Sequence, residues 1–255
     1  MESWFRMGMI WLIVPANCLF KNMAEPLSKR KIVAQVRHKL VLKLDEYKMQ
    51  ERQRLERALV FAEDAHDGQY RRPSYASAKR GLPYIVHPMR VAMIILEELE
   101  LKDPVAVNGA ILHDVIESKR EKIGIADIER EFGRAVAMIV SVLTAPEVGA
   151  SESEEQARSR KNTYHQRIRQ SSVVSKLVKL ADRLDSVREA VIWLDQDLKT
   201  SYLEETREVY LPIAEATDSY LYEELHDACA HLEEAIKNPP EPAGAELDED
   251  YFFKK

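Results

Sequence analysis

Apolar residues recur at helical spacing through most of this chain. Over residues 31–47 the spacing of Ile32, Val36 and Leu40 predicts an amphipathic helix, and a second helix is expected from about residue 51 to residue 67. The remaining segments with a helical pattern are 88–96, 104–117, 125–132, 135–143, a stretch starting near 156, 173–194 and 199–237. The pattern therefore predicts an all-α fold.

Composition agrees with this prediction. The chain of 255 residues is long enough for one substantial core, and its 8 glycines and its runs of Leu, Ala, Glu, Lys and Arg favour helices over a sheet. A net charge of −6 argues against a surface built for nucleic acid, although a phosphate-rich small ligand needs only a local basic pocket. Two cysteines, Cys18 and Cys229, form no disulfide framework or zinc motif, which fits a cytoplasmic protein.

The two ends of the chain differ from the rest. Residues 7–20 are apolar but broken by Pro15 and Asn17, too short for a membrane span and preceded by a poor signal-peptide start. This segment is a weak signal or anchor, a helix covering a neighbour, or translated sequence upstream of a start at Met23, and we favour the last. We expect an extension over 1–28, one domain over 29–238 and a flexible acidic tail over 239–255 after a run of prolines.

The segment from Ala110 to Ser118 carries polar groups where packing alone would require aliphatic side chains. His113 and Glu117 are four residues apart, as are Asp114 and Ser118, so each pair shares a helix face. We interpret this segment as half of a metal site with a water molecule. The alternative for any single histidine is a buried imidazole bonded to a backbone carbonyl.

Two further polar residues in apolar helical contexts complete a mixed set of ligands. His87 precedes Pro88, which suits a first helical position, and Asp182 lies on the apolar face of the helix over 173–194. Together with His113 and Asp114 they suit Mn²⁺, Fe²⁺ or Zn²⁺ better than Ca²⁺. For Asp182 the alternative is a structural ion pair with Lys179 or Arg183.

The blocks that carry these residues resemble the HD-domain hydrolases, and within them the RelA/SpoT-type enzymes that remove the 3′-pyrophosphate of (p)ppGpp. The similarity spans residues 55 to 234 and leaves no room for the synthetase domain of the long bifunctional enzymes. The chain is therefore most similar to the short, hydrolase-only members such as the metazoan SpoT homologue. The matching blocks are Ala65-His66-Asp67-Gly68-Gln69-Tyr70-Arg71-Arg72, 81–88, 112–117 and 179–183.

The resemblance implies an HD-domain helical bundle with a metal site between helices, His87, His113, Asp114 and Asp182 holding Mn²⁺. Catalysis is assigned to Glu117, which would orient or deprotonate the attacking water, together with Ser118. We expect the nucleotide (p)ppGpp as substrate, no nucleic-acid or membrane partner, and a possible homo-oligomer. The residues expected to bind substrate are Arg71, Arg72, Lys161, Lys179, Arg183 and Ser186.

Three positions depart from the family pattern. Ser118 stands where the family has a catalytic Asp, Ser186 where it has Asn, and Asp185 where it has His. A serine can hold a water but cannot take a proton at neutral pH. Three hypotheses follow: a (p)ppGpp hydrolase, an HD phosphohydrolase of another nucleotide, or a catalytically weakened nucleotide-binding regulatory protein.

Overall fold

A computed structural model describes residues 27–71, 81–149, 151–193 and 195–239. These residues are almost entirely helical, and their only β contact is an isolated bridge between Tyr70 and Pro83, so the all-α prediction is confirmed. Residues 1–26 and the tail beyond 239 lie outside the described part. The helices are α1 (Leu27–Leu44), α2 (Met49–Ala65), α3 (Val86–Met93), η1 (Ile94–Glu98), α4 (Pro104–Leu112), α5 (Val115–Ser118), α6 (Ile125–Phe132), α7 (Arg134–Leu143), α8 (Glu154–Arg169), α9 (Val173–Trp193), α10 (Gln196–Glu205), η2 (Thr206–Tyr210), α11 (Leu211–Glu215) and α12 (Ser219–Lys237).

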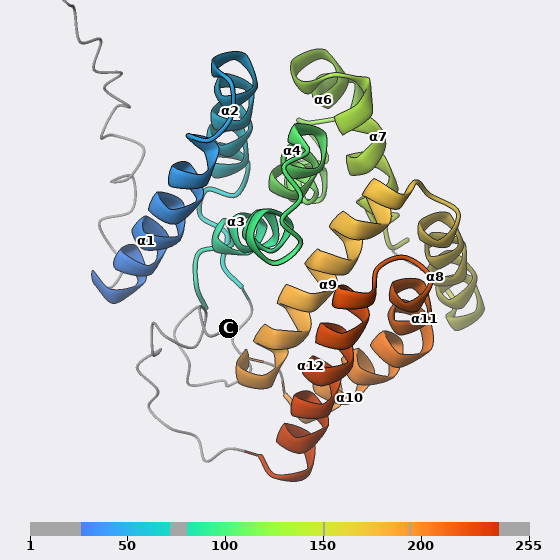
Figure 1. Cartoon of the computed structure of the whole chain (residues 1–255). Helices are drawn as coiled ribbons and strands as arrows, with labels where there is room; N and C mark the ends of the chain where they lie inside the picture. Colours follow the sequence, from blue (N-terminus) through green and yellow to red (C-terminus); the bar gives the residue numbers. More distant parts are fainter. Residues whose placement is uncertain (1–26, 72–80, 150, 194, 240–255) are drawn as a thin grey trace, which may run out of the picture.

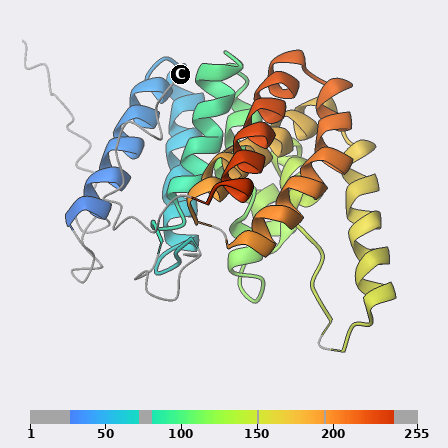
Figure 2. The same cartoon turned by 90° about the horizontal axis from the view of Figure 1, so that it is seen from below.

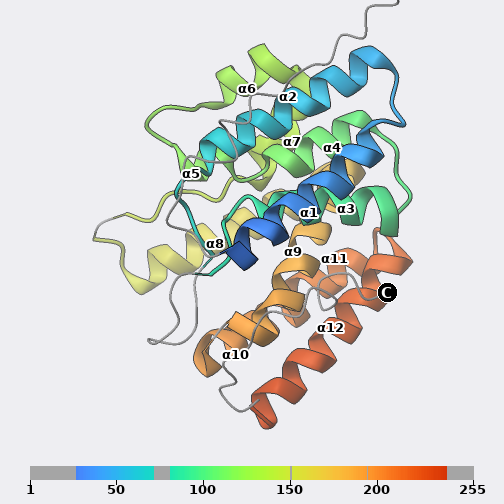
Figure 3. The same cartoon turned by 90° about the vertical axis from the view of Figure 1, so that its left-hand side faces the viewer.

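Helix α9 is the central element of the bundle. It runs through the middle of the molecule, with α1 to α7 on one side and α10 to α12 on the other (Figures 1 and 3). It packs against α3, α4, α7, α10 and α12. Helix α8 stands at one edge, where Figure 2 shows it beyond α9 and at the end of the long connection from α7. Because α9 contacts both halves, a polar residue on it can face groups from several other helices.

Close packing between α4 and α7 fixes the helix that leads to the histidine-aspartate pair. Gly109 faces Ile139, and a Cβ atom at position 109 would lie 2.8 Å from the Cγ2 atom of Ile139. Only glycine leaves room for the side chain of Ile139 this close to the backbone of α4. Ala106, Val107 and Ala110 around it are fully buried, so this part of α4 is held on several sides.

Several predicted boundaries need correction. Helix α3 begins at Val86, so Pro88 is its third residue and not its first; proline is tolerated there because the first N–H groups of a helix have no partner inside it. The helix expected over 104–117 is interrupted at His113 and Asp114. The region 199–237 is divided, with turns around Ala216 and Thr217. None of the described helices is long and apolar enough to cross a membrane.

Candidate metal centre

Three separate parts of the fold bring the four predicted metal ligands together. His87 comes from the first turn of α3, His113 and Asp114 from the break between α4 and α5, and Asp182 from the middle of α9. Neighbouring residues of a continuous helix point about 100° apart. Because α4 ends at Leu112, His113 and Asp114 depart from that arrangement and both approach the same point.

The distances between these groups suit one metal ion. The Nε2 atom of His87 lies 3.1 Å from Oδ1 of Asp182 and 3.8 Å from Oδ2 of Asp114, and Nε2 of His113 lies 3.7 Å from Oδ1 of Asp182. Three ligand atoms, one from each of His87, His113 and Asp182, lie within 4.8 Å of one another. An ion bound at about 2.1 Å separates its ligand atoms by roughly 3 to 4 Å, which these spacings match.

Both imidazole rings are oriented by a contact on their far side. Nδ1 of His87 donates to Asp185 at 2.6 Å, and Nδ1 of His113 donates to the carbonyl oxygen of Ala110 at 2.8 Å. Each ring therefore directs Nε2 toward the centre, as in metal sites whose histidines are held by an outer partner. Nε2 of His113 is buried and makes no hydrogen bond, although Asp114 Oδ2 lies 3.1 Å away in an unsuitable direction. This unsatisfied nitrogen is what a metal ligand would leave.

The carboxylates are held in their charged form. Burial opposes this, but Lys179 and the two imidazoles keep the pKa of Asp182 well below its usual range. Oδ2 of Asp182 accepts a hydrogen bond from Lys179 at 2.7 Å while Oδ1 faces the histidines. The metal-ligand and ion-pair interpretations of Asp182 are thus compatible. Although burial acts against it, Asp114 and Asp182 raise the pKa of His113 to about 9, so the centre attracts positive charge.

A buried network extends from His87 away from the centre. Asp185, which orients His87, pairs with Arg90 through both oxygens at 2.6 and 2.9 Å. Arg90 also pairs with Glu189 at 3.0 Å, and Glu189 pairs with Arg71. Burial opposes ionisation, but Arg90 and His87 lower the pKa of Asp185. Asp185 therefore fixes a ligand, a role that sequence reasoning missed although Asp182, Asp185 and Glu189 share one face of α9.

A second set of contacts surrounds Asp114 and Ser118. Tyr84 donates its hydroxyl to Oδ2 of Asp114 at 2.6 Å and stacks on His66, with ring centroids 4.8 Å apart. Burial lowers the pKa of His66 to about 4, so this imidazole is neutral. Its Nδ1 lies 2.9 Å from the hydroxyl oxygen of Ser118 and 3.0 Å from Oε1 of Gln69. Ser118 thus contacts a neutral histidine beside the centre, a contact that the sequence pattern did not indicate.

Glu117 is anchored at the surface end of α5. One of its carboxylate oxygens accepts a hydrogen bond from the backbone N–H of Ala145, in the connection that follows α7. The residue is exposed overall, but burial of its carboxyl group, together with the negative charge of nearby Asp114, raises the pKa of Glu117. The second oxygen has no hydrogen bond among the described residues. Glu117 thus combines a fixed orientation with a free acceptor.

The predicted substrate-binding residues differ in their surroundings. Arg183 is 6% exposed and bonds to Thr206, to the Tyr202 carbonyl and to Glu205, so it ties α9 to α10 and η2. Lys179 is committed to Asp182. Lys161 pairs with Glu205 on the wall of a cavity of about 440 Å³ between α8 and the connection that follows α7.

Two further candidates, Arg71 and Ser186, lie close to each other. The guanidinium of Arg71 is 3.5 Å from the hydroxyl of Ser186, besides its pair with Glu189. Arg72 lies outside the described residues. The structure therefore brings Arg71 and Ser186 together, while Arg183 has its donors occupied within the fold.

The fold and the centre define the class of protein. The family model for the HD domain matches residues 58–219, and the chain belongs to that family, whose members depend on a metal ion. Helical content and the His/Asp cluster agree with this membership. The match includes all four predicted ligands.

Particular relatives share the same region. The chain is 34% identical over 163 residues to the bifunctional (p)ppGpp synthase/hydrolase SpoT of Escherichia coli, covering 63% of this chain and 21% of the relative. It is 32% identical over 167 residues to the guanosine-3′,5′-bis(diphosphate) 3′-pyrophosphohydrolase of Aquifex aeolicus, covering 65% and 22%. The aligned part thus spans about a fifth of the length of these curated relatives.

A solved structure supports the fold. A metazoan ortholog of SpoT, described as hydrolysing ppGpp and acting in starvation responses, superposes with a TM-score of 0.60 at 23% identity. The superposition covers 72% of this chain and 96% of the other. At this identity the likeness establishes the HD-domain helical fold.

Proposed function

We propose that this chain is a metal-dependent pyrophosphohydrolase that removes the 3′-pyrophosphate of (p)ppGpp, giving GDP or GTP and pyrophosphate. The single observation that supports this best is the convergence of His87, His113, Asp114 and Asp182 with both Nε2 atoms directed inward. The names of the two relatives indicate (p)ppGpp as the substrate.

We assign Mn²⁺ to the centre because two imidazoles and two carboxylates are a donor set that this ion accepts. When bound, such an ion supplies Lewis acidity toward a phosphoryl oxygen and a water nucleophile. His87, His113, Asp114 and Asp182 would hold it, with Asp185 fixing the ring of His87.

In the proposed reaction the residues around the centre position water and neutralise charge. Glu117 orients the attacking water or takes its proton, an assignment favoured by its fixed first oxygen, its free second oxygen and its raised pKa. Ser118 holds a water by hydrogen bonding. The water oxygen bonds to the phosphorus that carries the 3′ oxygen, the bond between that phosphorus and the 3′ oxygen breaks, the 3′ oxygen takes a proton, and the pyrophosphate is released with the water oxygen on it.

The basic residues would bind the phosphate groups of the nucleotide. Arg71 pairs with Glu189, which Arg90 and Asp185 connect to the ligand candidate at the start of α3, and its guanidinium carries a rigid fork of donors. Lys161 borders the cavity between α8 and the connection after α7. We retain Arg72, Lys179 and Ser186 as candidates, and Arg183 as a residue that acts through the packing of α9 against α10.

We also propose that residues 29–238 form the hydrolase domain and that the activity is cytoplasmic. The family match over 58–219 supports the domain, and the two cysteines without a disulfide pattern support the compartment. A homo-oligomer and the lack of a nucleic-acid partner remain expectations from composition and resemblance.

A second candidate function is a weakened hydrolase that binds a nucleotide as a regulatory protein, or a phosphohydrolase of another nucleotide. The observation that favours it is Ser118, which bonds to neutral His66 and offers no carboxylate where the family has one. A protein that keeps the metal ligands but lacks that carboxylate would still bind the nucleotide but would hydrolyse it slowly.

A substrate panel separates these functions. Purified protein with Mn²⁺ should release pyrophosphate from ppGpp and pppGpp but leave GDP and GTP, which lack the 3′ group, unchanged. Hydrolysis of a nucleotide without a 3′-pyrophosphate in preference to ppGpp would instead support another phosphohydrolase. Tight binding of ppGpp without turnover would support the regulatory protein.

A further inference from the structure

A cavity of about 340 Å³ lies at the far end of α2 and α4 from the metal centre. It is bordered by the start of α2, the first turn of α4 and the junction of α6 and α7. On α2, Arg54 precedes His66 by twelve residues, which is about 18 Å of helix. The cavity is therefore separate from the centre described above.

The wall contributed by α4 holds an unsatisfied polar group. Asn108 is 2% exposed, and its Nδ2 donates to the carbonyl of Pro104 at 2.6 Å. Its Oδ1 is buried and accepts no hydrogen bond. Because that contact with Pro104 fixes the amide, Oδ1 is the atom left without a partner, and an unpaired buried acceptor costs about 1 to 3 kcal/mol.

The opposite wall is the uncapped beginning of α7. Gly133 has a φ of 91°, a conformation that favours glycine, and it turns the chain sharply from α6 into α7. No side chain caps this ten-residue helix, and its first turn has no acidic residue. The backbone N–H groups of 134–136 therefore lie on the cavity wall without partners inside the helix and favour an anion.

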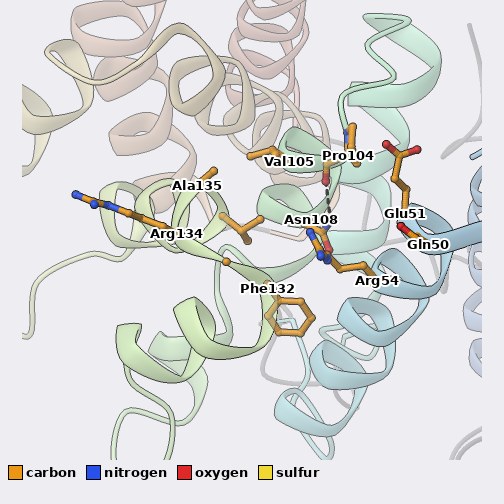
Figure 4. A pocket seen from close by; sticks show the side chains of 11 residues that line it. Gln50, Glu51, Arg54, Pro104, Val105, Asn108, Phe132, Arg134 and Ala135 are labelled. Carbon is orange, nitrogen blue, oxygen red and sulfur yellow. Dashed lines mark hydrogen bonds between the residues drawn. The ribbon is translucent and has the colours of Figure 1, made fainter. Parts of the chain in front are cut away.

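One positive side chain completes the site. Arg54 reaches from α2 toward Asn108, whereas the side chains of Arg134 and Glu51 point away from Asn108 (Figure 4). Arg54 is exposed, so its guanidinium can turn toward an anion seated on the start of α7. The three elements thus offer donors for an anion and one acceptor for a hydrogen-bond donor.

We propose that this cavity binds a small phosphate monoester that also carries a hydroxyl or amino group. The phosphate is held by Arg54 and the start of α7. When Arg54 turns from Asn108 toward the phosphate, it uncovers Oδ1 of Asn108 (Figure 4), which accepts a hydrogen bond from the hydroxyl or amino group of the ligand. A ligand of ribose 5-phosphate size suits the lower range of small-molecule sites, which begins at about 300 Å³. The site is independent of the proposed hydrolase function.

Titration calorimetry tests the proposal, with a chelator present so that the metal centre contributes no affinity. Ribose 5-phosphate should bind the parent chain, inorganic phosphate more weakly, and ribose not at all. Arg54→Ala should weaken binding of ribose 5-phosphate at least tenfold. Arg57→Ala, an exposed arginine on the same helix outside the cavity, should leave it unchanged.

A second variant guards against a folding effect. Ala135→Asp adds a negative charge at the start of α7, which stabilises a helix but repels phosphate, so it should bind at least tenfold more weakly without loss of melting temperature. Failure of the parent chain to bind ribose 5-phosphate, or equal binding by Arg54→Ala, would overturn the proposal and leave Arg54 as a cover for Asn108. Equal affinity for inorganic phosphate would overturn the role of Asn108.

Discussion

Asp185 accepts a hydrogen bond from Nδ1 of His87 at 2.6 Å and is itself fixed by Arg90 through both of its oxygens. The aspartate here orients a metal ligand from behind, while Asp182, one turn earlier on α9, faces the same ring from the front. The centre therefore depends on two carboxylates of one helix, of which only Asp182 is a ligand candidate.

Asp185→Asn should weaken metal binding about 10- to 100-fold, because an amide must turn its NH₂ group toward either His87 or Arg90. Calorimetric titration with Mn²⁺ measures this. The matched control is Asp197→Asn, an exposed aspartate on α10, which should bind as the parent does. Unchanged affinity in Asp185→Asn would show that the ring of His87 is fixed by other means.

Ser118→Asp should raise pyrophosphate release from ppGpp by at least about tenfold, because a carboxylate at this position can accept a proton and a hydroxyl cannot. Steady-state rates with Mn²⁺ provide the test. The control Ser118→Asn introduces a side chain of the same shape as aspartate but without its charge, and it should show no gain in rate. If both variants match the parent, the missing carboxylate is not what limits the rate.

Arg71→Met should lower the free energy of unfolding by about 2 kcal/mol, because Glu189 then lies buried with one cation fewer, although Arg90 still contacts it. Urea denaturation measures the loss. Adding Glu189→Gln to Arg71→Met should restore part of it if the two side chains are coupled. Strictly additive losses would mean that the pair is not coupled in solution.

Gly109→Ala should destabilise the fold by up to about 2 kcal/mol. The better helix propensity of alanine is worth about 1 kcal/mol, but overpacking against Ile139 costs about 1 to 3 kcal/mol and outweighs it. Melting temperature reports the result. Gly124→Ala is the control, because nothing lies closer than 3.8 Å to its new Cβ. A higher melting temperature for Gly109→Ala would mean that α4 and α7 separate easily.

Much of the fold could be predicted because its apolar spacing is local information. The spacing that predicted helices over 31–47 and 173–194 corresponds to α1 and α9, with ends that differ by a few residues. The interruption at His113 and Asp114 could not be read from spacing, since Val115 and Ile116 continue the apolar pattern. Helix breaks of this kind depend on contacts with distant residues, here the Tyr84 hydroxyl on Asp114.

For the candidate site, the sequence indicated side chains that the fold does bring together, while their role as metal ligands stays a prediction. His87, His113, Asp114 and Asp182 stand out as polar residues in apolar segments, and the fold brings them together. The surrounding partners were not predictable, because Arg90 and Glu189 look like ordinary surface charges in the sequence. Arg71 was expected to bind substrate, and its ion pair with Glu189 was not foreseen. Only the three-dimensional arrangement shows that Arg183 bonds within the fold, whereas its position in the motif suggested substrate binding.

The central claim is most directly tested by measuring pyrophosphate release from ppGpp with Mn²⁺ for the parent chain, for Asp182→Ala and for Asp64→Ala, an exposed aspartate on α2 as control. We predict turnover in the parent and in Asp64→Ala. In Asp182→Ala the rate of turnover should fall by at least about a hundredfold, and the bound metal should be lost. Turnover retained by Asp182→Ala, or absent from the parent while metal is bound, would contradict the assignment of this centre to (p)ppGpp hydrolysis.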